Sequence, residues 1–226
     1  MTTTHDLGFM LYCSFGNGYR LAKNPHYLEV MTVGAESLAT RYDERVKAIK
    51  SWNSNEKWQF PVIIDNMMNL EMLMWASKNS NDPKFAKIAQ SHADVTMKHH
   101  FRPDYSSYHV VSYDTISGQP EKKNTCQGYA HESSWARGQG WALYGYTMMY
   151  RETKQKKYLN QAIHVARFIM AHPQLPEDKI PYWDFDDPAI PNTPRDASAG
   201  ALIASALIEL SQYTESKFSK RMFVGG

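Results

Sequence analysis

A two-helix pattern recurs along the chain, and it limits the possible folds more than any other feature of the sequence. Asp6, Asp65, Arg137 and Asp196 each precede a helical segment rich in small or apolar residues, and these starts recur roughly every 60 to 70 residues. A polar turn and a second amphipathic helix follow three of them; the turns are 23–27, 81–85 and 155–158. Stacked helix pairs share a core, so the pattern predicts an all-α protein.

The helices expected from periodicity and start signals cover 65–78, 83–101, 134–151, 155–171 and 196–213, and residues after Asp6 supply the first ones. Asp65 and Asp196 stand where N-cap residues belong, and Pro83 suits a first helical turn. The segments 102–131 and 172–195 break the helical pattern with Pro and Gly, and the first contains a β-like stretch at 108–113. Long ordered loops in a compact helical domain usually carry function.

Helix pairs joined by long loops on one face are typical of an α/α toroid, whose inner helices line a cleft. The sequence supplies seven helices and part of an eighth, whereas a closed (α/α)6 ring needs twelve. We therefore expect residues 1–226 to form one partial toroid domain, with material missing at both ends. An incomplete ring would leave apolar helix faces exposed.

Charge and hydropathy exclude several classes of function. The chain has 25 Lys+Arg and 23 Asp+Glu, so its formal charge of +2 gives no support for a nucleic-acid or polybasic membrane surface. No apolar run is long enough for a membrane-spanning helix. Aromatic residues make up 13% of the chain, which fits both a packed core and a sugar-binding cleft. Oligomeric state and location, cytoplasmic or periplasmic, stay open.

Asp6 and Asp65 are the first candidate catalytic residues. Each could simply be the N-cap of the helix that follows it. Alternatively, equivalent ends of inner helices meet around the cleft of a toroid, and two carboxylates facing one cleft suit glycosidic chemistry. A helix N-terminus lowers a carboxyl pKa, whereas apolar neighbours of Asp65 such as Ile63, Ile64 and Met68 raise it. The sequence leaves this balance open.

The other candidates lie in the long loop and at the start of the helix after it. His109 follows a polar, aromatic stretch and is either a ligand contact or a structural residue. Arg137 can clamp a carboxylate with two parallel hydrogen bonds, and Trp135 and Trp141 could stack on a sugar ring. In the alternative interpretation, the two tryptophans belong to the core and Arg137 pairs with an internal aspartate.

The remaining histidines suggest no metal site. His92, His99 and His100 lie on an amphipathic helix and are predicted to be surface residues. A metal site of this kind needs two ligands one helical turn apart and a third partner, and we find no convincing set.

Several short motifs, in a defined order, identify a family that the chain resembles: the unsaturated glucuronyl hydrolases, glycoside hydrolase family 88. The matching stretches are His5–Phe9, Ile63–Leu70, Ser106–His109, Gln127–Trp141, Tyr182–Phe185 and Arg195–Ala199. Each is short, but together they are specific and cover nearly the whole chain. Family members extend past both ends of this set, which is why we expect only part of the ring here.

The resemblance implies an (α/α)6 barrel and a particular reaction. Such enzymes remove a 4,5-unsaturated glucuronic acid from the non-reducing end of lyase-generated oligosaccharides of glycosaminoglycan type. A carboxylic acid protonates C4 of the vinyl ether, water adds at C5, and the resulting hemiketal opens and releases the next sugar. No cofactor or metal is implied. The expected partner is an unsaturated uronic-acid oligosaccharide.

Matched residue by residue, Asp65 takes the position of the catalytic acid/base, and Asp6 that of a second essential aspartate that holds the sugar by its ring hydroxyls. The resemblance assigns substrate contacts to His109, Gln127, Arg137, Trp135 and Trp141, and more weakly to His5.

Two other functions remain as alternatives. A sugar epimerase on the same toroid would depend on paired active-site histidines. A truncated, inactive carbohydrate-binding remnant, or a fragment that assembles with another chain, would bind an unsaturated disaccharide without consuming it.

Overall fold

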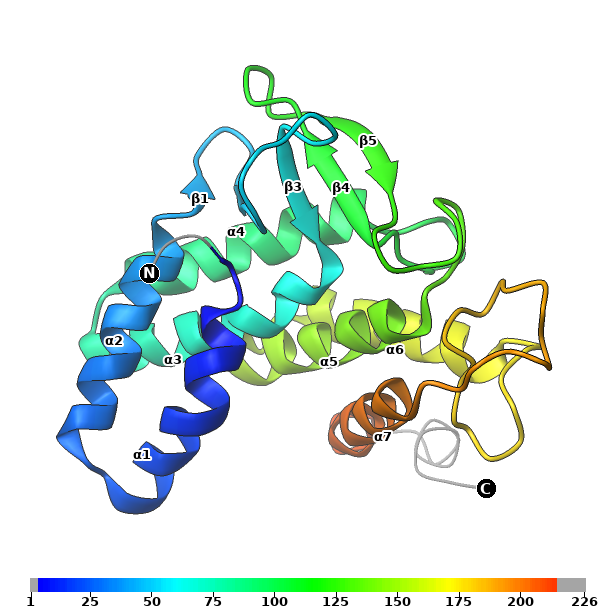
Figure 1. Ribbon diagram of the computed structural model, residues 1–226. Coiled ribbons are helices and arrows are strands. Elements are labelled where there is room, and N and C mark those ends of the chain that lie inside the picture. The colour runs from blue at the N-terminus through cyan, green and yellow to red at the C-terminus, as the bar shows by residue number, and fades with distance from the viewer. Residues whose placement is uncertain (1–3, 215–226) are drawn as a thin grey trace. The chain divides into compact units, whose positions relative to one another are not determined.

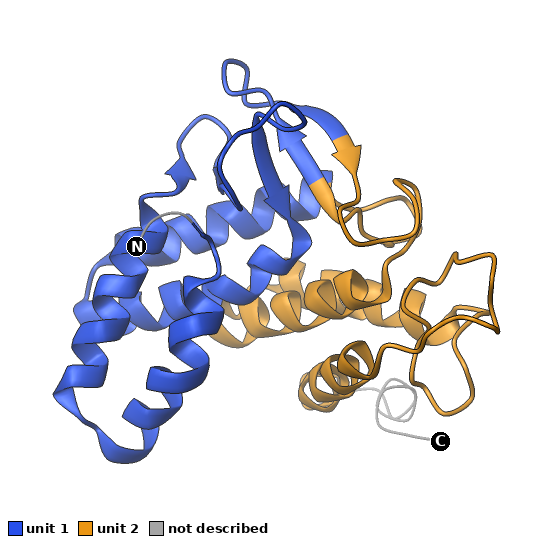
Figure 2. Cartoon of the chain, in the orientation of Figure 1, with its two compact units in different colours: residues 1–99, 111–122 blue, residues 100–110, 123–226 orange. Residues whose placement is uncertain are grey.

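The computed structural model describes residues 4–214, and the chain divides into two compact units (Figure 2). Unit 1 comprises residues 1–99 and 111–122, and unit 2 comprises residues 100–110 and 123–226. Each unit has its own buried core. The single catalytic domain expected over 1–226 stays a prediction.

Unit 1 is built mainly from helices that pack in sequence order (Figure 1). They are the π-helix η1 (Gly8–Gly16), α1 (Asn17–Ala22), α2 (Pro25–Ala39), the 3-10 helix η2 (Ile64–Asn69), α3 (Leu70–Ser80) and α4 (Pro83–His99). Its core includes Met31, Leu38, Met67, Met72 and Phe85, all almost fully buried. Within residues 4–214 the chain has seven α-helices, the number expected from the sequence.

The turns inside the helix pairs share one backbone conformation. The first helix ends at a residue with positive φ: Lys23 (+52°), Asn81 (+55°) and, in unit 2, Lys154 (+57°). In unit 1 the next residue accepts a hydrogen bond from the backbone N–H two residues on, at 2.9 Å for Asn24 and for Asp82. These side chains cap the second helix and satisfy one of its exposed donors. The three turns thus share the left-handed end of the first helix, whereas the side-chain cap is found in the two turns of unit 1 and is absent at Gln155.

A small sheet accompanies the helices of unit 1. The strands β1 (Tyr42–Asp43) and β2 (Ala48–Ile49) pair antiparallel, and β3 (Phe60–Ile63), β4 (Val110–Tyr113) and β5 (Pro120–Asn124) form a three-stranded sheet in that order. The turn between β4 and β5 contains Gly118 at φ +71°, where a Cβ would lie 2.4 Å from the Arg45 carbonyl oxygen. Glycine is required there. The β-like stretch predicted at 108–113 is confirmed by β4, whereas β3 and β5 were not expected.

Unit 2 consists of α5 (Ala136–Thr153), α6 (Lys156–Ala171) and α7 (Ala197–Ser211), and α5 packs against both others (Figure 1). Most faces of α5 are buried, as its small and aromatic residues predict. Asp196 caps α7 by accepting a hydrogen bond from the Ala199 N–H at 2.9 Å, as predicted.

Some apolar side chains are exposed on the helices. They are Met10, Leu21 and Val33 in unit 1 and Ile208 in unit 2. None of the helices within residues 4–214 is long and apolar enough to cross a membrane.

The N-cap interpretation is wrong for both candidate aspartates. The residue before η1 is Leu7 and the residue before η2 is Ile63, and neither position carries a side-chain cap. Asp65 is the second residue of η2, and α3 begins only at Leu70. A 3-10 turn inserted before the α-helix displaces Asp65 from the position that its sequence context suggested.

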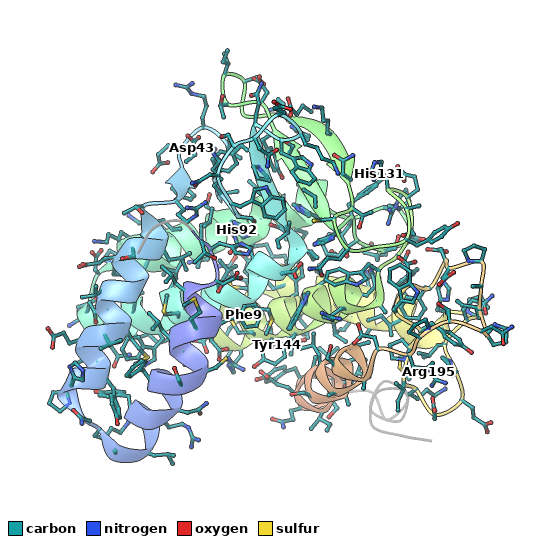
Figure 3. All side chains as sticks on the ribbon, viewed as in Figure 1. Phe9, Asp43, His92, His131, Tyr144 and Arg195 are labelled. Carbon is teal, nitrogen blue, oxygen red and sulfur yellow. The ribbon has the colours of Figure 1, made fainter. Side chains whose placement is uncertain are left out.

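The prediction that the α4 histidines are surface residues is also wrong for two of them. His92 and His100 are fully buried, and His99 is half-buried. His92, labelled in Figure 3, accepts a hydrogen bond at Nδ1 from the Ile49 N–H of β2 at 3.0 Å. The strands, which the sequence did not reveal, cover the side of α4 that had been assigned to solvent.

Candidate functional site

Asp6 is a half-exposed carboxylate held by two donors. His5 Nε2 lies 2.9 Å from Oδ1, and the Thr4 hydroxyl donates to Oδ2 at 3.1 Å. The hydrogen bond from His5 is the main reason why the pKa of Asp6 lies below its ordinary value, against the opposing effect of partial burial. Asp6 is therefore an anion at neutral pH, able to accept hydrogen bonds.

His5 is itself anchored inside unit 1. Its side chain is buried (4% exposed), and its backbone N–H donates to the Ser51 carbonyl oxygen at 3.3 Å. Ser51 in turn accepts a hydrogen bond from the Ile63 N–H at 3.0 Å. This chain of contacts joins the residue before Asp6 to the strand that leads into Asp65.

Buried amides connect the two aspartate-bearing segments a second time. The Phe9 N–H of η1 donates to Asn69 Oδ1 at 3.0 Å, Asn69 Nδ2 lies 3.4 Å from Asn66 Oδ1, and Asn66 Nδ2 donates to the Ile49 carbonyl oxygen at 2.9 Å (Figure 3 labels Phe9). A Cβ on Gly8 would lie 2.5 Å from the Asn69 Cα. Close backbone approach and buried hydrogen bonds thus fix η1 against η2.

Asp65 occupies a more apolar setting than Asp6. It is partly exposed and lies in η2, between buried Ile64 and buried Asn66, with Ile63 and Met67 also buried nearby in sequence. The structure thus places both predicted carboxylates in unit 1, on segments that contact each other through Asn69.

His109 in unit 2 is buried (5% exposed) and accepts hydrogen bonds. Its Nδ1 receives the N–H groups of Cys126 at 3.2 Å and Gln127 at 3.1 Å, and its ring lies 4.5 Å from that of Trp135. Burial lowers the pKa of His109 to about 3. The imidazole is therefore neutral at physiological pH, with its proton on Nε2. It holds the backbone of Gln127, whose side chain is exposed.

A buried carboxylate that the sequence did not single out shapes the same loop. Asp184 is fully buried, and its Oδ2 accepts the Tyr129 N–H at 2.9 Å and the Ser133 hydroxyl at 2.7 Å. A Cβ on Gly128 would lie 3.1 Å from this oxygen. Two signals in the sequence pointed to it: Asp184 lies within the Tyr182–Phe185 motif, and it is an acidic residue inside an apolar, aromatic patch, which is unusual unless the acid is hydrogen-bonded.

Arg137 pairs with an internal aspartate, as the alternative interpretation proposed. Its Nε and Nη2 each lie 3.0 Å from Asp196 Oδ2. The arginine side chain is 39% exposed, whereas that of Asp196 is 6% exposed. The pair uses two of the five N–H donors of a guanidinium.

The two tryptophans differ in exposure. Trp135 is buried, with its ring against His109 and with the Arg137 guanidinium 5.4 Å from the ring centre. Trp141, on α5, is only partly buried. Trp135 therefore fits the core interpretation, and Trp141 is the better placed of the two to meet a ligand.

Residues 4–214 contain no cluster of three or more His, Cys, Asp or Glu side chains that could hold a metal ion. The candidate groups are carboxylates in unit 1, and an imidazole, an amide, a guanidinium and aromatic rings in unit 2.

Comparison with known proteins identifies the family. The model of Glycosyl Hydrolase Family 88 matches residues 5–221, and the chain belongs to this family.

Curated relatives share its sequence over most of this chain. An unsaturated glucuronyl hydrolase of Formosa agariphila is 55% identical over 216 residues, which make up 95% of this chain and 54% of the relative. An unsaturated chondroitin disaccharide hydrolase of Streptococcus agalactiae is 33% identical and is matched over 92% of this chain and 52% of the relative. The chain thus spans about half the length of these relatives.

Solved structures agree. An unsaturated glucuronyl hydrolase specific for heparin superposes with a TM-score of 0.96 at 54% identity, over 99% of this chain and 60% of that structure. A variant of the Streptococcus agalactiae enzyme, complexed with dGlcA-GalNAc6S, gives a TM-score of 0.79 at 30% identity, over 97% of this chain and 53% of that structure. The expected fold class, an all-α (α/α)6 toroid of which this chain supplies part, is confirmed.

Proposed function

We propose that this chain carries the catalytic carboxylates of a hydrolase that removes 4,5-unsaturated glucuronic acid from the non-reducing end of glycosaminoglycan-type oligosaccharides. The observation that carries this proposal is the relationship to the unsaturated glucuronyl hydrolases, which extends over almost the whole chain. These relatives do not favour the alternative of a sugar epimerase.

In the proposed reaction the carboxylic acid of Asp65 protonates C4 of the vinyl ether, and water adds at C5. The water gives up a proton to the Asp65 carboxylate as it adds, which restores the acid. The hemiketal that forms then opens and breaks the glycosidic bond.

Asp6 has the complementary role of holding the sugar. Donors from His5 and Thr4 keep it ionised, and its half-exposed carboxylate can accept hydrogen bonds from ring hydroxyls. In unit 2 we assign substrate contacts to the exposed Gln127, to Arg137 and to Trp141, and His109 holds the backbone of Gln127 in place.

Asp65→Asn tests the proposal most directly. We expect turnover of an unsaturated disaccharide, measured as loss of the ultraviolet absorbance of its conjugated double bond, to fall by about 10²–10⁴-fold, the usual contribution of a general acid. Asp82→Asn is the matched control: it is the same substitution at a helix start in unit 1, where an asparagine oxygen can still cap α4. This control should keep the activity of the parent chain.

Two results would contradict the proposal. Turnover by Asp65→Asn at the parental rate would remove Asp65 from the role of proton donor. A parent chain that binds the disaccharide without consuming it would favour the carbohydrate-binding alternative over the hydrolase.

A further inference from the structure

His5 does not fit the substrate-contacting role that the family resemblance assigned to it. His5 is only 4% exposed, so its side chain presents little surface to a ligand. Its Nε2 faces Asp6 Oδ1 at 2.9 Å, while Nδ1 has no hydrogen-bond partner within residues 4–214. A carboxylate can only accept a hydrogen bond, so Nε2–H of His5 is the donor and Asp6 is the acceptor.

We propose that His5 is a positioning residue of the hydrolase: its buried imidazole fixes the orientation and the charge of the Asp6 carboxylate. The inference rests on the proposed function, because it assigns a role to His5 through Asp6, the residue that would hold the sugar.

The contacts around Asp6 support an orienting role. His5 donates to one carboxylate oxygen and Thr4 to the other, and the Asp6 backbone N–H donates back to the Thr4 hydroxyl at 3.1 Å. With both oxygens bound, the carboxylate cannot rotate without breaking a hydrogen bond. A preoriented acceptor loses less entropy when a sugar hydroxyl binds to it.

The imidazole is held as firmly as the carboxylate. The His5 backbone is bound to Ser51, and Ser51 is bound to the end of β3 through the Ile63 N–H. The donor therefore belongs to a segment whose backbone is hydrogen-bonded, through Ser51, to β3. In metal sites, loss of a group that orients a metal-binding side chain typically lowers metal affinity or activity about 10- to 100-fold, and we expect an effect at the lower end of this range here.

The charges that act on Asp6 are few. Among residues 4–214, His5 is the titratable neighbour that affects the Asp6 carboxylate, and Thr4 adds a neutral donor. Loss of the imidazole should therefore raise the pKa of Asp6, because the hydrogen bond from His5 is the largest influence that lowers it.

The first test measures Asp6 itself, without substrate. In chains labelled with 13C at aspartate carboxyls, we expect NMR titration of His5→Leu to show the Asp6 pKa raised, because the donor is gone. His5→Gln, which retains a side-chain N–H donor, should titrate closer to the parent. His26→Ala, at an exposed histidine beside Glu29, is the matched control and should leave Asp6 unchanged. An unchanged Asp6 titration in His5→Leu, or a glutamine variant identical to the leucine variant, would overturn the inference.

A second measurement needs no substitution and so does not depend on whether a variant folds. Ring 15N shifts of His5 in the parent chain should show a proton on Nε2, the nitrogen that faces Asp6. The opposite tautomer would leave Asp6 without its donor and would refute the proposal.

Kinetics then connect the inference to activity. For an active parent chain, we expect kcat/KM of His5→Leu to fall about tenfold at neutral pH, with its acid limb moved to higher pH and with partial recovery in His5→Gln. A merely structural role would lower activity without moving the acid limb. Should the parent chain show no turnover, the proposed function fails while both NMR results still decide the role of His5.

Discussion

His5 in unit 1 and His109 in unit 2 are both buried imidazoles, but they use their rings in opposite ways. His5 donates a hydrogen bond to the Asp6 carboxylate, whereas His109 accepts hydrogen bonds from the backbone N–H groups of Cys126 and Gln127. Protonation would leave the first bond intact and add a favourable charge to it. Protonation of His109 at Nδ1 would abolish both of the bonds that it accepts.

The contrast shows that burial alone does not define the task of a histidine. The group opposite the ring decides whether the ring fixes an anion or fastens a loop. It also implies that the loop after β5 is sensitive to acid, whereas the segment around Asp6 is held by the His5–Asp6 bond and by neutral hydrogen bonds to Asn69 and Ser51.

The largest effect should come from breaking the neutral network of unit 1. Asn69→Ala removes the acceptor of the Phe9 N–H and leaves a void in a fully buried position. We expect the free energy of unfolding to fall by about 2–3 kcal/mol, from one unsatisfied donor and the lost packing. Denaturant unfolding measures this change. A loss below about 0.5 kcal/mol would show that Asn69 does not join η1 to η2.

Acid should act next, through His109. Its pKa is about 3 in the folded chain, against 6.5 ordinarily, so between these pH values the unfolded state binds more protons. Stability must then fall as the pH drops below 6.5. From pH 7 to pH 5 the contribution of His109 is about 2 kcal/mol.

The test compares denaturant unfolding of the parent chain and His109→Asn across this range, above the region where carboxylates titrate. The asparagine variant should lose correspondingly less stability between the two pH values. Parallel pH dependences in the two proteins would contradict the neutral state assigned to His109.

A smaller effect is expected at the ion pair of unit 2. Asp196→Ala removes the cap of α7 and the partner of Arg137. The cap contributes about 1 kcal/mol, and the half-exposed Arg137 can turn to water, so the total loss should be about 1–2 kcal/mol in thermal unfolding. Asp178→Ala, which breaks an exposed pair with Arg195, is the control and should change stability less.

The smallest effect is expected at Glu132, in the loop between β5 and α5. Glu132 accepts hydrogen bonds from Arg102 and from the Tyr108 hydroxyl, but it is 74% exposed. Glu132→Gln should cost about 0.2–1 kcal/mol, and the cost should shrink in high salt. A loss that does not change with salt would indicate that the contact is neutral hydrogen bonding rather than ionic.

Local signals allowed much of the fold to be predicted. Capping residues followed by proline at Asn24 and Asp82 mark the starts of α2 and α4, because a cap depends only on residues a few positions apart. Strand β3 escaped prediction because four buried residues without alternation do not distinguish a strand from a helix. The burial of His92 depends on β2, a two-residue strand that was not predicted, so it could not be foreseen either.

The candidate site was also predictable only in part. Residue types and motifs selected Asp6, Asp65 and Arg137, and an internal partner for Arg137 was foreseen as an alternative. The donor from His5 and the buried Asp184 were not found, since hydrogen bonds that depend on side-chain orientation or on distant residues leave no periodic trace. The interpretation of Asp65 as an N-cap was wrong, because similar residues occur at the start of a 3-10 turn and at the N-cap of an α-helix.

Lys23, Asn81 and Lys154 end their helices in nearly the same left-handed conformation, although two are lysines and one is an asparagine. A left-handed residue turns the chain sharply at the end of a helix. The bend that separates the two helices of each pair therefore depends on backbone conformation at one residue, and different side chains can occupy it.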